Sequence, residues 1–197
     1  MNLMSDDIKR KAIATIEAHK KAVTVFEADA IDTIIAAGEL ITKALKQNGC
    51  LYICGNGGSA ADAQHIASEL VGKFEKHRKS LPAIALTTDT SIITSISNDY
   101  GYEAVFAKQV EAFVKKGDVL LAISTSGTSK NIIDAAELAK KKGASVLAFT
   151  GKSNSKLEQI ADICFCANNE STARSQEIHQ LGFHIICGLV EDIFTNS

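Results

Sequence analysis

Five short apolar runs alternate with longer helical stretches through most of this chain of 197 residues. The runs are Leu51–Cys54, Ala83–Leu86, Val119–Ser124, Ser145–Thr150 and Ile163–Cys166. Because successive positions are apolar, both faces of each strand should be buried, as in a parallel sheet covered by helices. Helices are expected over residues 59–76, 91–97 with 103–116, 128–142, 154–161 and 171–194. The alternation predicts a three-layer α/β/α sandwich with a five-stranded parallel sheet.

Residues 5–48 precede this alternation and have the apolar spacing of helix, close to a period of 3.6. Gly49 ends the stretch, and a break near residues 27–29 would divide it into two helices. We expect residues 1–48 to form N-terminal helices and residues 49–197 to form one compact domain. Two long amphipathic helices ahead of a compact core suit subunit association, although packing on the chain's own sheet explains the pattern equally well.

The composition is that of a soluble globular protein with a sizeable core, with 46% hydrophobic and 22% charged residues. The net charge of −2 gives no global basic excess to favour nucleic acid. The N-terminus has no signal-peptide hydrophobic segment, and no apolar stretch is long enough to span a membrane. The five cysteines are Cys50, Cys54, Cys164, Cys166 and Cys187. Their odd number and mostly apolar surroundings indicate reduced core thiols, so we expect a cytoplasmic protein.

Two polar loops follow predicted strands and begin predicted helices. The first, Gly55–Ser59, has three glycines that let backbone N–H groups approach an anion, and Ser59 adds a hydroxyl. In the second, Ser124–Ser129, hydroxyls replace most of the glycines. Either loop alone could be an ordinary capped turn, because Ser and Thr are favoured N-caps. Two such loops at strand carboxyl ends of one sheet favour anion binding. Neither has the lysine of a P-loop, and the glycine spacing fits a dinucleotide fingerprint poorly.

Four longer motifs in this chain resemble those of a known family. They are Cys54–His65, Ser97–Gly101, Ala122–Ser129 and Arg174–His179. Together, and in this order, they resemble the sugar isomerase (SIS) family and, within it, the phosphoheptose isomerases, which act on sedoheptulose 7-phosphate. The resemblance covers nearly the whole chain and implies a flavodoxin-like SIS fold. It also implies homotetramers whose sites lie between subunits.

Two pairs of helical residues are candidates for chemistry. His65 and Glu69 lie four apart on one helix face, and Gln176 and His184 lie eight apart on another. From the residues alone, a surface ion pair, a solvated glutamine and a core histidine are the better interpretations. The resemblance implies instead that Glu69 is the general base and His184 the general acid of an enediol proton transfer. It also implies one zinc ion per subunit, with His65, Glu69, Gln176 and His184 as its ligands.

The resemblance implies a substrate site as well. Its residues are Asn56, Gly57, Gly58, Ser59, Glu69, Asn98, Asp99, Ser124, Thr125, Ser126, Ser129 and Gln176. Without the family, the turn containing Asn98 and Asp99 would be an ordinary turn. The implied reaction converts D-sedoheptulose 7-phosphate to D-glycero-D-manno-heptose 7-phosphate, which would supply heptose for lipopolysaccharide or another surface glycan.

Other functions remain open at this point. A non-catalytic SIS protein that binds the replication initiator would keep the same loops and fold. A sugar-phosphate sensor would need a DNA-binding segment, which does not accompany this domain. Isomerisation of another ketose or amino-sugar phosphate is also compatible with the loops. Glu69 and His184 favour an enzyme over the non-catalytic protein.

Overall fold

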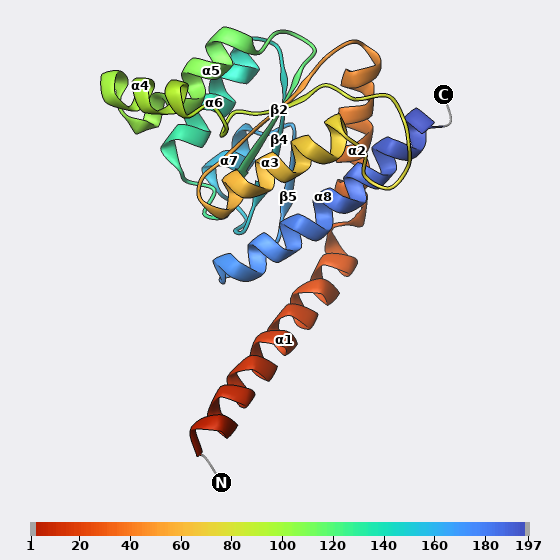
Figure 1. Cartoon of the computed structure of the whole chain (residues 1–197), viewed down its shortest axis with the longest axis vertical. Helices are drawn as coiled ribbons and strands as arrows, with labels where there is room; N and C mark the ends of the chain where they lie inside the picture. Colours follow the sequence, from red (N-terminus) through yellow and green to blue (C-terminus); the bar gives the residue numbers. More distant parts are fainter. Residues whose placement is uncertain (1–2, 196–197) are drawn as a thin grey trace.

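The computed structural model describes residues 3–195. The predicted region 1–48 therefore begins with two residues outside this range, and the predicted region 49–197 ends with two. Five strands form one sheet in the order β2-β1-β3-β4-β5, with every neighbouring pair parallel (Figure 1). They are β1 (Leu51–Gly55), β2 (Ala83–Ala85), β3 (Val119–Ser124), β4 (Ser145–Thr150) and β5 (Ile163–Cys166). This is the flavodoxin-like order, so the predicted fold class is confirmed.

The central strands are buried on both faces, as their unbroken apolar runs predict. Every residue of β1 and β3 is buried. Leu51 and Ile53 pack into one hydrophobic cluster, while Tyr52 and Cys54 pack into the cluster on the opposite face. A parallel sheet covered on both sides buries its strands in this way.

Helices cover both faces of the sheet (Figure 1). On one face lie α2 (Ile31–Lys46), α3 (Gly58–Val71) and α8 (Thr172–Thr195). The other face is covered by α5 (Val105–Phe113), α6 (Lys130–Lys141) and α7 (Lys156–Ile160), with α4 (Thr90–Tyr100) and the short 3₁₀ helix Tyr102–Ala104 beside them. The predicted helix 59–76 was five residues too long at its carboxyl end, because α3 stops at Val71 and a loop follows.

The N-terminal stretch divides into two helices, α1 (Leu3–Asp29) and α2, with the bend at Ala30. The predicted break therefore lies within three residues of the observed one. Helix α2 buries Ile34 and Ala37 against the sheet, whereas α1 extends away from the body (Figure 1). Ile8, Ile13 and Ile16 of α1 are exposed.

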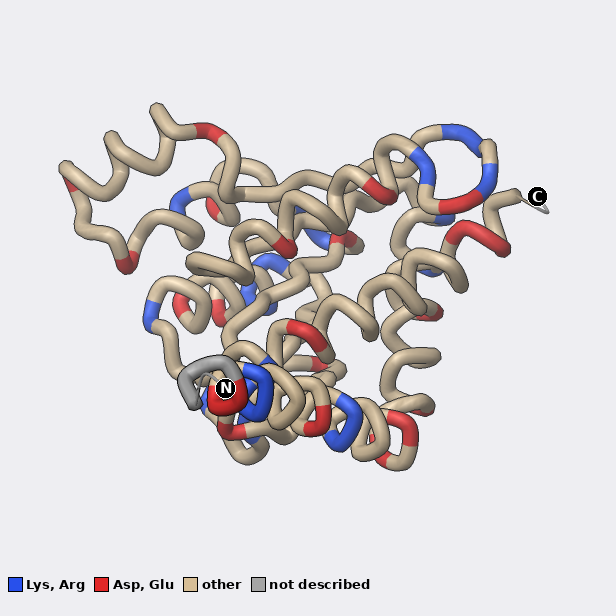
Figure 2. The backbone as a smooth tube through the Cα atoms, turned by 60° about the horizontal axis from the view of Figure 1, so that its bottom comes forward, with Lys and Arg blue, Asp and Glu red and all other residues tan. Residues whose placement is uncertain are grey.

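Acidic and basic residues are interspersed over the described residues and are not gathered by sign on one face (Figure 2). The five cysteines are free, and Cys54 and Cys187 are buried. Burial raises the pKa of the Cys54 thiol to about 12, which keeps it protonated and inert. Among the described helices, none is long and apolar enough to cross a membrane.

Candidate active site

The two predicted anion loops meet at the carboxyl ends of β1 and β3. Together with the start of α8 they enclose a cavity of about 270 Å³. Its lining residues are Asn56, Gly57, Gly58, Ser59, Ile123, Ser124, Thr125, Ser129, Thr172 and Gln176. Ligands of open α/β sheets bind at this edge, so the cavity has the expected place for a ligand.

The two helices that follow the loops, α3 and α6, lack a side-chain cap. Gly57 precedes α3 with φ at +56°, a left-handed conformation that favours glycine. Ser129 precedes α6, but its hydroxyl accepts no hydrogen bond from the first turn of that helix. The ordinary capped turn, which the sequence left open for either loop, is therefore not what these loops form. The first N–H groups of α3 and α6 and the positive ends of the two helix dipoles remain available to an anion.

Hydroxyl groups line the β3 side of the cavity. Ser124 Oγ lies 3.1 Å from Ser129 Oγ and 3.4 Å from Ser126 Oγ. Ser126 also accepts hydrogen bonds from the backbone N–H and the hydroxyl of Thr128. Ser126 and Thr125 also line a neighbouring cavity of about 260 Å³. The predicted hydroxyl cluster is thus brought together, with Ser126 at its outer edge.

Asn56 is held in place by residues that the sequence analysis missed. Asn56 and Asn131 exchange amide hydrogen bonds, each 2.9 Å long. Tyr102 donates a third from its hydroxyl to Asn56 Oδ1, also at 2.9 Å. Asn131 is buried at the start of α6. No local pattern marks such a pair, because its members lie 75 positions apart in the sequence.

The proposed base and acid meet in a second cluster, where α3 and α8 lie side by side. The ligand atoms of His65, Glu69 and His184 all lie within 4.8 Å of one another. Glu69 Oε1 is 2.9 Å from His65 Nε2, and the two imidazole rings are 5.1 Å apart. His184 also contacts two aromatic rings, Phe183 at 4.5 Å and Phe74 at 5.6 Å. Two imidazoles and one carboxylate at these distances can move protons or bind a metal ion.

The surroundings of His184 favour its neutral form. Burial lowers its pKa, and the nearby His65 lowers it further, while the Glu69 carboxylate opposes both effects. A neutral imidazole can donate a proton from one ring nitrogen and accept one at the other.

Gln176 lies apart from this cluster. Its side chain reaches the backbone of Gly58, at the cavity between the loops. Eight residues of α8 separate it from His184, about 12 Å along the helix axis. Helices α3 and α8 run in the same direction, because Gly58 contacts Gln176 and Asp62 Oδ1 accepts a hydrogen bond from Gln180. The structure therefore places Gln176 with the anion loops, whereas the sequence also predicted it as a fourth metal ligand.

The structure does not bring Asn98 and Asp99 into the cavity. Both are near the carboxyl end of α4, where Asn98 donates a hydrogen bond to Asp99 at 2.8 Å. None of the residues of α4 is buried, and the helix projects from the body beside α5 (Figure 1). Within one chain these two side chains contribute nothing to the lining.

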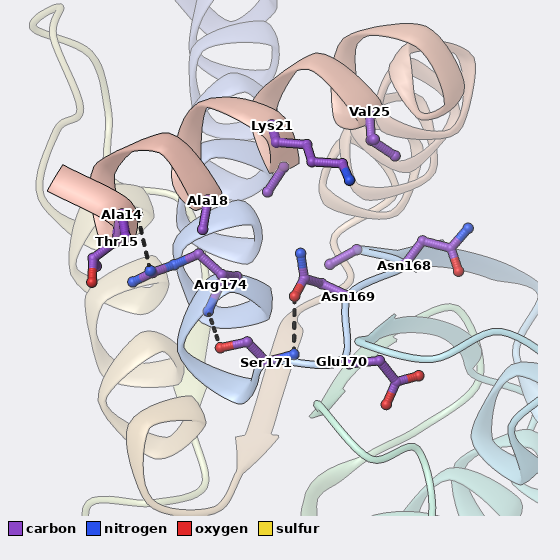
Figure 3. A pocket seen from close by; sticks show the side chains of 12 residues that line it. Ala14, Thr15, Ala18, Lys21, Val25, Asn168, Asn169, Glu170, Ser171 and Arg174 are labelled. Carbon is purple, nitrogen blue, oxygen red and sulfur yellow. Dashed lines mark hydrogen bonds between the residues drawn. The ribbon is translucent and has the colours of Figure 1, made fainter. Parts of the chain in front are cut away.

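A larger cavity of about 520 Å³ lies between α1 and residues 167–174 (Figure 3). Lys21 and Asn169 line it, and Arg174 donates a hydrogen bond from Nη1 to the carbonyl of Thr15. The neighbouring Ser175 is buried and donates to the carbonyl of Asn169. Ser175 thus stabilises the segment before α8. The contact between Arg174 and Thr15 ties the middle of α1 to the body.

Comparisons with known proteins agree with this geometry. Residues 15–151 match the SIS domain family. The chain is 47% identical over 191 residues to a phosphoheptose isomerase of Roseiflexus sp. (strain RS-1), covering 97% of each chain. The solved structure of phosphoheptose isomerase GmhA from Neisseria gonorrhoeae has 39% identity and a TM-score of 0.89, covering 94% of this chain and 99% of that one. A phosphoheptose isomerase structure from Francisella tularensis has 36% identity and a TM-score of 0.90, with 93% and 97% covered. The chain therefore belongs to the phosphoheptose isomerase family of SIS-domain proteins.

Proposed function

We propose that this protein isomerises D-sedoheptulose 7-phosphate to D-glycero-D-manno-heptose 7-phosphate. The observation that carries the proposal is the meeting of Glu69 and His184 from two helices that also border the anion cavity. The reacting end of a sugar would lie at this pair and its phosphate at the loops. Seven residues of α3 separate Gly58 from His65, about 10 Å along the helix. An extended seven-carbon sugar phosphate can span that distance.

The proposed reaction moves one proton between adjacent carbons. The Glu69 carboxylate takes a proton from carbon 1 of the ketose, which gives an enediol, and returns a proton to carbon 2. His184 donates a proton to the carbonyl oxygen at carbon 2 and accepts one from the hydroxyl at carbon 1. The lowered pKa of His184 suits both steps because the neutral ring has one donor and one acceptor. Each role typically contributes about 10²- to 10⁴-fold to the rate.

The same cluster fits a zinc ion. Two imidazoles and one carboxylate form a donor set found in catalytic zinc sites, with a fourth position open. His65, Glu69 and His184 would hold the ion. The sequence also predicts Gln176 as a ligand, but within one chain its side chain lies at the anion loops. When bound, zinc would polarise the carbonyl group of the sugar. The histidine and carboxylate side chains would still orient the substrate against the α3–α8 surface.

Substrate binding is proposed to use the loop residues together with a neighbouring subunit. Asn56, Gly57, Gly58 and Ser59 would face the phosphate with the hydroxyls of Ser124, Thr125, Ser126 and Ser129. Asn98 and Asp99 are exposed on α4 and would bind sugar hydroxyls in the adjacent subunit of a homotetramer. This arrangement accounts for their place outside the cavity of their own chain.

Helix α1 is the proposed association surface within residues 1–48. Its exposed Ile8, Ile13 and Ile16 lie on a helix that extends from the body, whereas α2 packs against the core that residues 49–197 form. A helix with one apolar side in water gains stability by packing against another chain. We further propose that the enzyme works in the cytoplasm and supplies heptose for lipopolysaccharide or another surface glycan.

The non-catalytic alternative, an SIS protein that binds the replication initiator, is less well supported. Such a protein needs the loops and the fold but has no use for an acid and a base. Glu69 and His184 are both present, and their ligand atoms lie within 4.8 Å of each other. The acid–base pair therefore favours the enzyme.

Deuterium incorporation tests the proposal directly. The protein is incubated with sedoheptulose 7-phosphate in deuterated water, with and without added zinc, and the product is analysed for deuterium at carbon 2. Incorporation is expected with the unaltered protein and not with the Glu69→Gln variant. A well-folded protein that exchanges no deuterium in either condition would refute the isomerase.

A further inference from the structure

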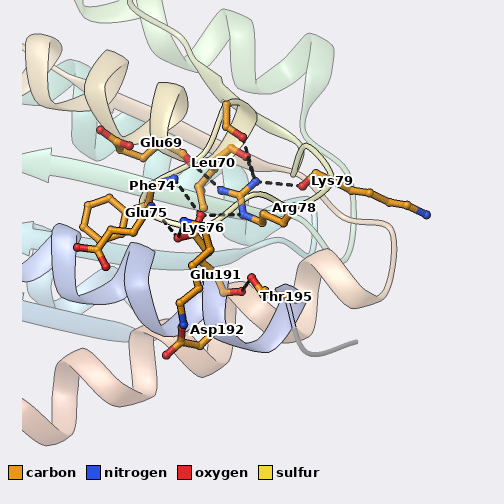
Figure 4. Close-up of polar contacts among 11 residues, drawn as sticks. Glu69, Leu70, Phe74, Glu75, Lys76, Arg78, Lys79, Glu191, Asp192 and Thr195 are labelled. Carbon is orange, nitrogen blue, oxygen red and sulfur yellow. Dashed lines mark hydrogen bonds and ion pairs between the residues drawn. The ribbon is translucent and has the colours of Figure 1, made fainter.

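A buried ion pair outside the cavities joins the loop after α3 to the end of α8 (Figure 4). Arg78 Nε lies 3.3 Å from Glu191 Oε1, and the two side chains are only 1% and 2% exposed. Nε has no hydrogen-bond partner of suitable angle, so the contact is electrostatic. Burying two charges is costly unless further hydrogen bonds satisfy them. Both side chains have such bonds, and these bonds lead to the proposed acid and base.

Glu191 fixes the loop through its backbone. Its carboxylate accepts hydrogen bonds from the N–H groups of Phe74, Glu75 and Lys76, at 2.9, 2.7 and 2.7 Å. Burial alone would raise the pKa of Glu191, but these three bonds and the charge of Arg78 together lower it. The side chain is therefore an anion at neutral pH and holds three consecutive residues of the loop.

Arg78 holds the end of α3. Its Nη1 donates to the carbonyls of Leu70, Gly72 and Lys79, and its Nη2 donates to the carbonyl of Glu69 at 2.7 Å. The last carbonyls of a helix have no partner within the helix, so the guanidinium takes the place of the missing turn. One of the residues held in this way is the proposed catalytic base.

The loop also reaches the proposed acid. Phe74 stacks on the ring of His184 at 5.6 Å with an interplanar angle of 22°. Glu191, which holds the backbone of Phe74, follows His184 by seven residues, about two turns of α8. Arg78 thus supports the turn that carries Glu69, and Glu191 supports the ring that covers His184.

We propose that the Arg78–Glu191 pair positions Glu69 and His184 for proton transfer, with Phe74 as the contact to His184. This inference rests on the proposed function of these two residues. The pair lies at the opposite end of α3 from Gly57 and Gly58, so it acts on the chemistry and leaves phosphate binding unchanged. None of the three residues is a proposed substrate contact, and Arg78 and Glu191 are buried; each acts through the acid or the base.

The first test compares Glu191→Gln with Asp192→Asn. Asp192 is the next residue of α8 and forms an exposed ion pair at 2.6 Å with Lys76 of the same loop, so it is a matched control. Steady-state rates with sedoheptulose 7-phosphate give kcat and KM separately. We expect Glu191→Gln to lower kcat by about 10- to 100-fold, the loss typical when a residue that only orients the side chains of an active site is replaced. KM should stay close to that of the unaltered enzyme, and Asp192→Asn should change neither constant.

A second pair of variants guards against simple misfolding, because removing one partner of a buried ion pair also destabilises a fold. Phe74 is partly exposed, so Phe74→Leu should fold while losing the stacked ring. Phe74→Tyr keeps the ring and should retain kcat. The ring-proton resonance of His184, assigned with His184→Gln, reports the stacking without any turnover. It should move in Phe74→Leu and Glu191→Gln but not in Phe74→Tyr or Asp192→Asn.

The outcomes separate this inference from the proposed function. If the unaltered protein does not isomerise the sugar, the proposed function fails, and the positioning of His184 is still judged from its resonance. The inference is overturned if folded Glu191→Gln and Phe74→Leu keep the kcat and the His184 resonance of the unaltered protein. It is also overturned if the loss of kcat in both variants equals their unfolded fraction.

Discussion

His179 should make the protein sensitive to acid, and the structure sets the size of the effect. The side chain is fully buried on α8, where its Nε2–H donates to the carbonyl of Thr150 at 2.9 Å. Its Nδ1 has no partner, and the rings of Phe149 and Phe165 pack around it. Burial lowers the pKa of His179 to about 4, although the bond to Thr150 opposes the effect.

The direction in which pH changes the stability follows from the pKa of His179 in the folded and unfolded chains. Below an ordinary pKa of 6.5, His179 of the unfolded chain takes up a proton, while in the folded chain it stays neutral until about pH 4. The contribution of neutral His179 to stability is therefore fully present above pH 6.5 and is lost as the pH falls toward 4. The difference corresponds to about 3 kcal/mol in total, of which about 2 kcal/mol is lost by about pH 5. For a domain of this size that lowers the Tm by roughly 4–8 °C.

The assay compares the unaltered protein with His179→Gln, whose amide can still donate to Thr150. Thermal or denaturant unfolding is measured at about pH 7 and at about pH 5. Because the substitution also disturbs packing, the decisive quantity is the change of each protein between the two pH values. His77→Gln, at an exposed position, is the control. If His179→Gln loses as much stability on acidification as the unaltered protein, His179 is not the cause and the reasoning is wrong.

Four further outcomes are expected. Glu69→Gln should lower kcat by about 10²- to 10⁴-fold while calorimetry still detects sugar-phosphate binding, and retained turnover would place the base elsewhere. Ser124→Ala should raise KM by roughly fivefold in steady-state assays, the loss of one hydrogen bond, and an unchanged KM would count against the loop. A chelator should lower turnover if zinc takes part, and zinc alone should restore it; an unaffected rate would remove the metal from the reaction. Deletion of residues 1–29 should reduce the mass measured by light scattering, and an intact tetramer would assign association to other surfaces.

The strands and their layers were predictable because burial acts locally. A strand covered on both faces must be apolar at successive positions, as Val119–Ser124 is, and helices must be apolar along one side. The two loops were predictable for a similar reason, since glycines and hydroxyls at a strand-to-helix junction suit an anion. Helix ends were less certain. Residues 72–76 could continue a helix by pattern. Glu191, more than 100 positions away, instead binds the backbone of residues 74–76 and holds them in a loop.

The chemistry divides in the same way. The sequence by itself determined the fold class, the two anion loops and, through family motifs, the candidates Glu69 and His184. Only the tertiary structure decided which candidate side chains meet, because α3 and α8 run side by side in the same direction. That packing joins His65, Glu69 and His184 in one cluster and leaves Gln176 at the loops. It also creates the Arg78–Glu191 pair, which no spacing in the sequence could reveal, since its energy depends on burial that distant segments provide together.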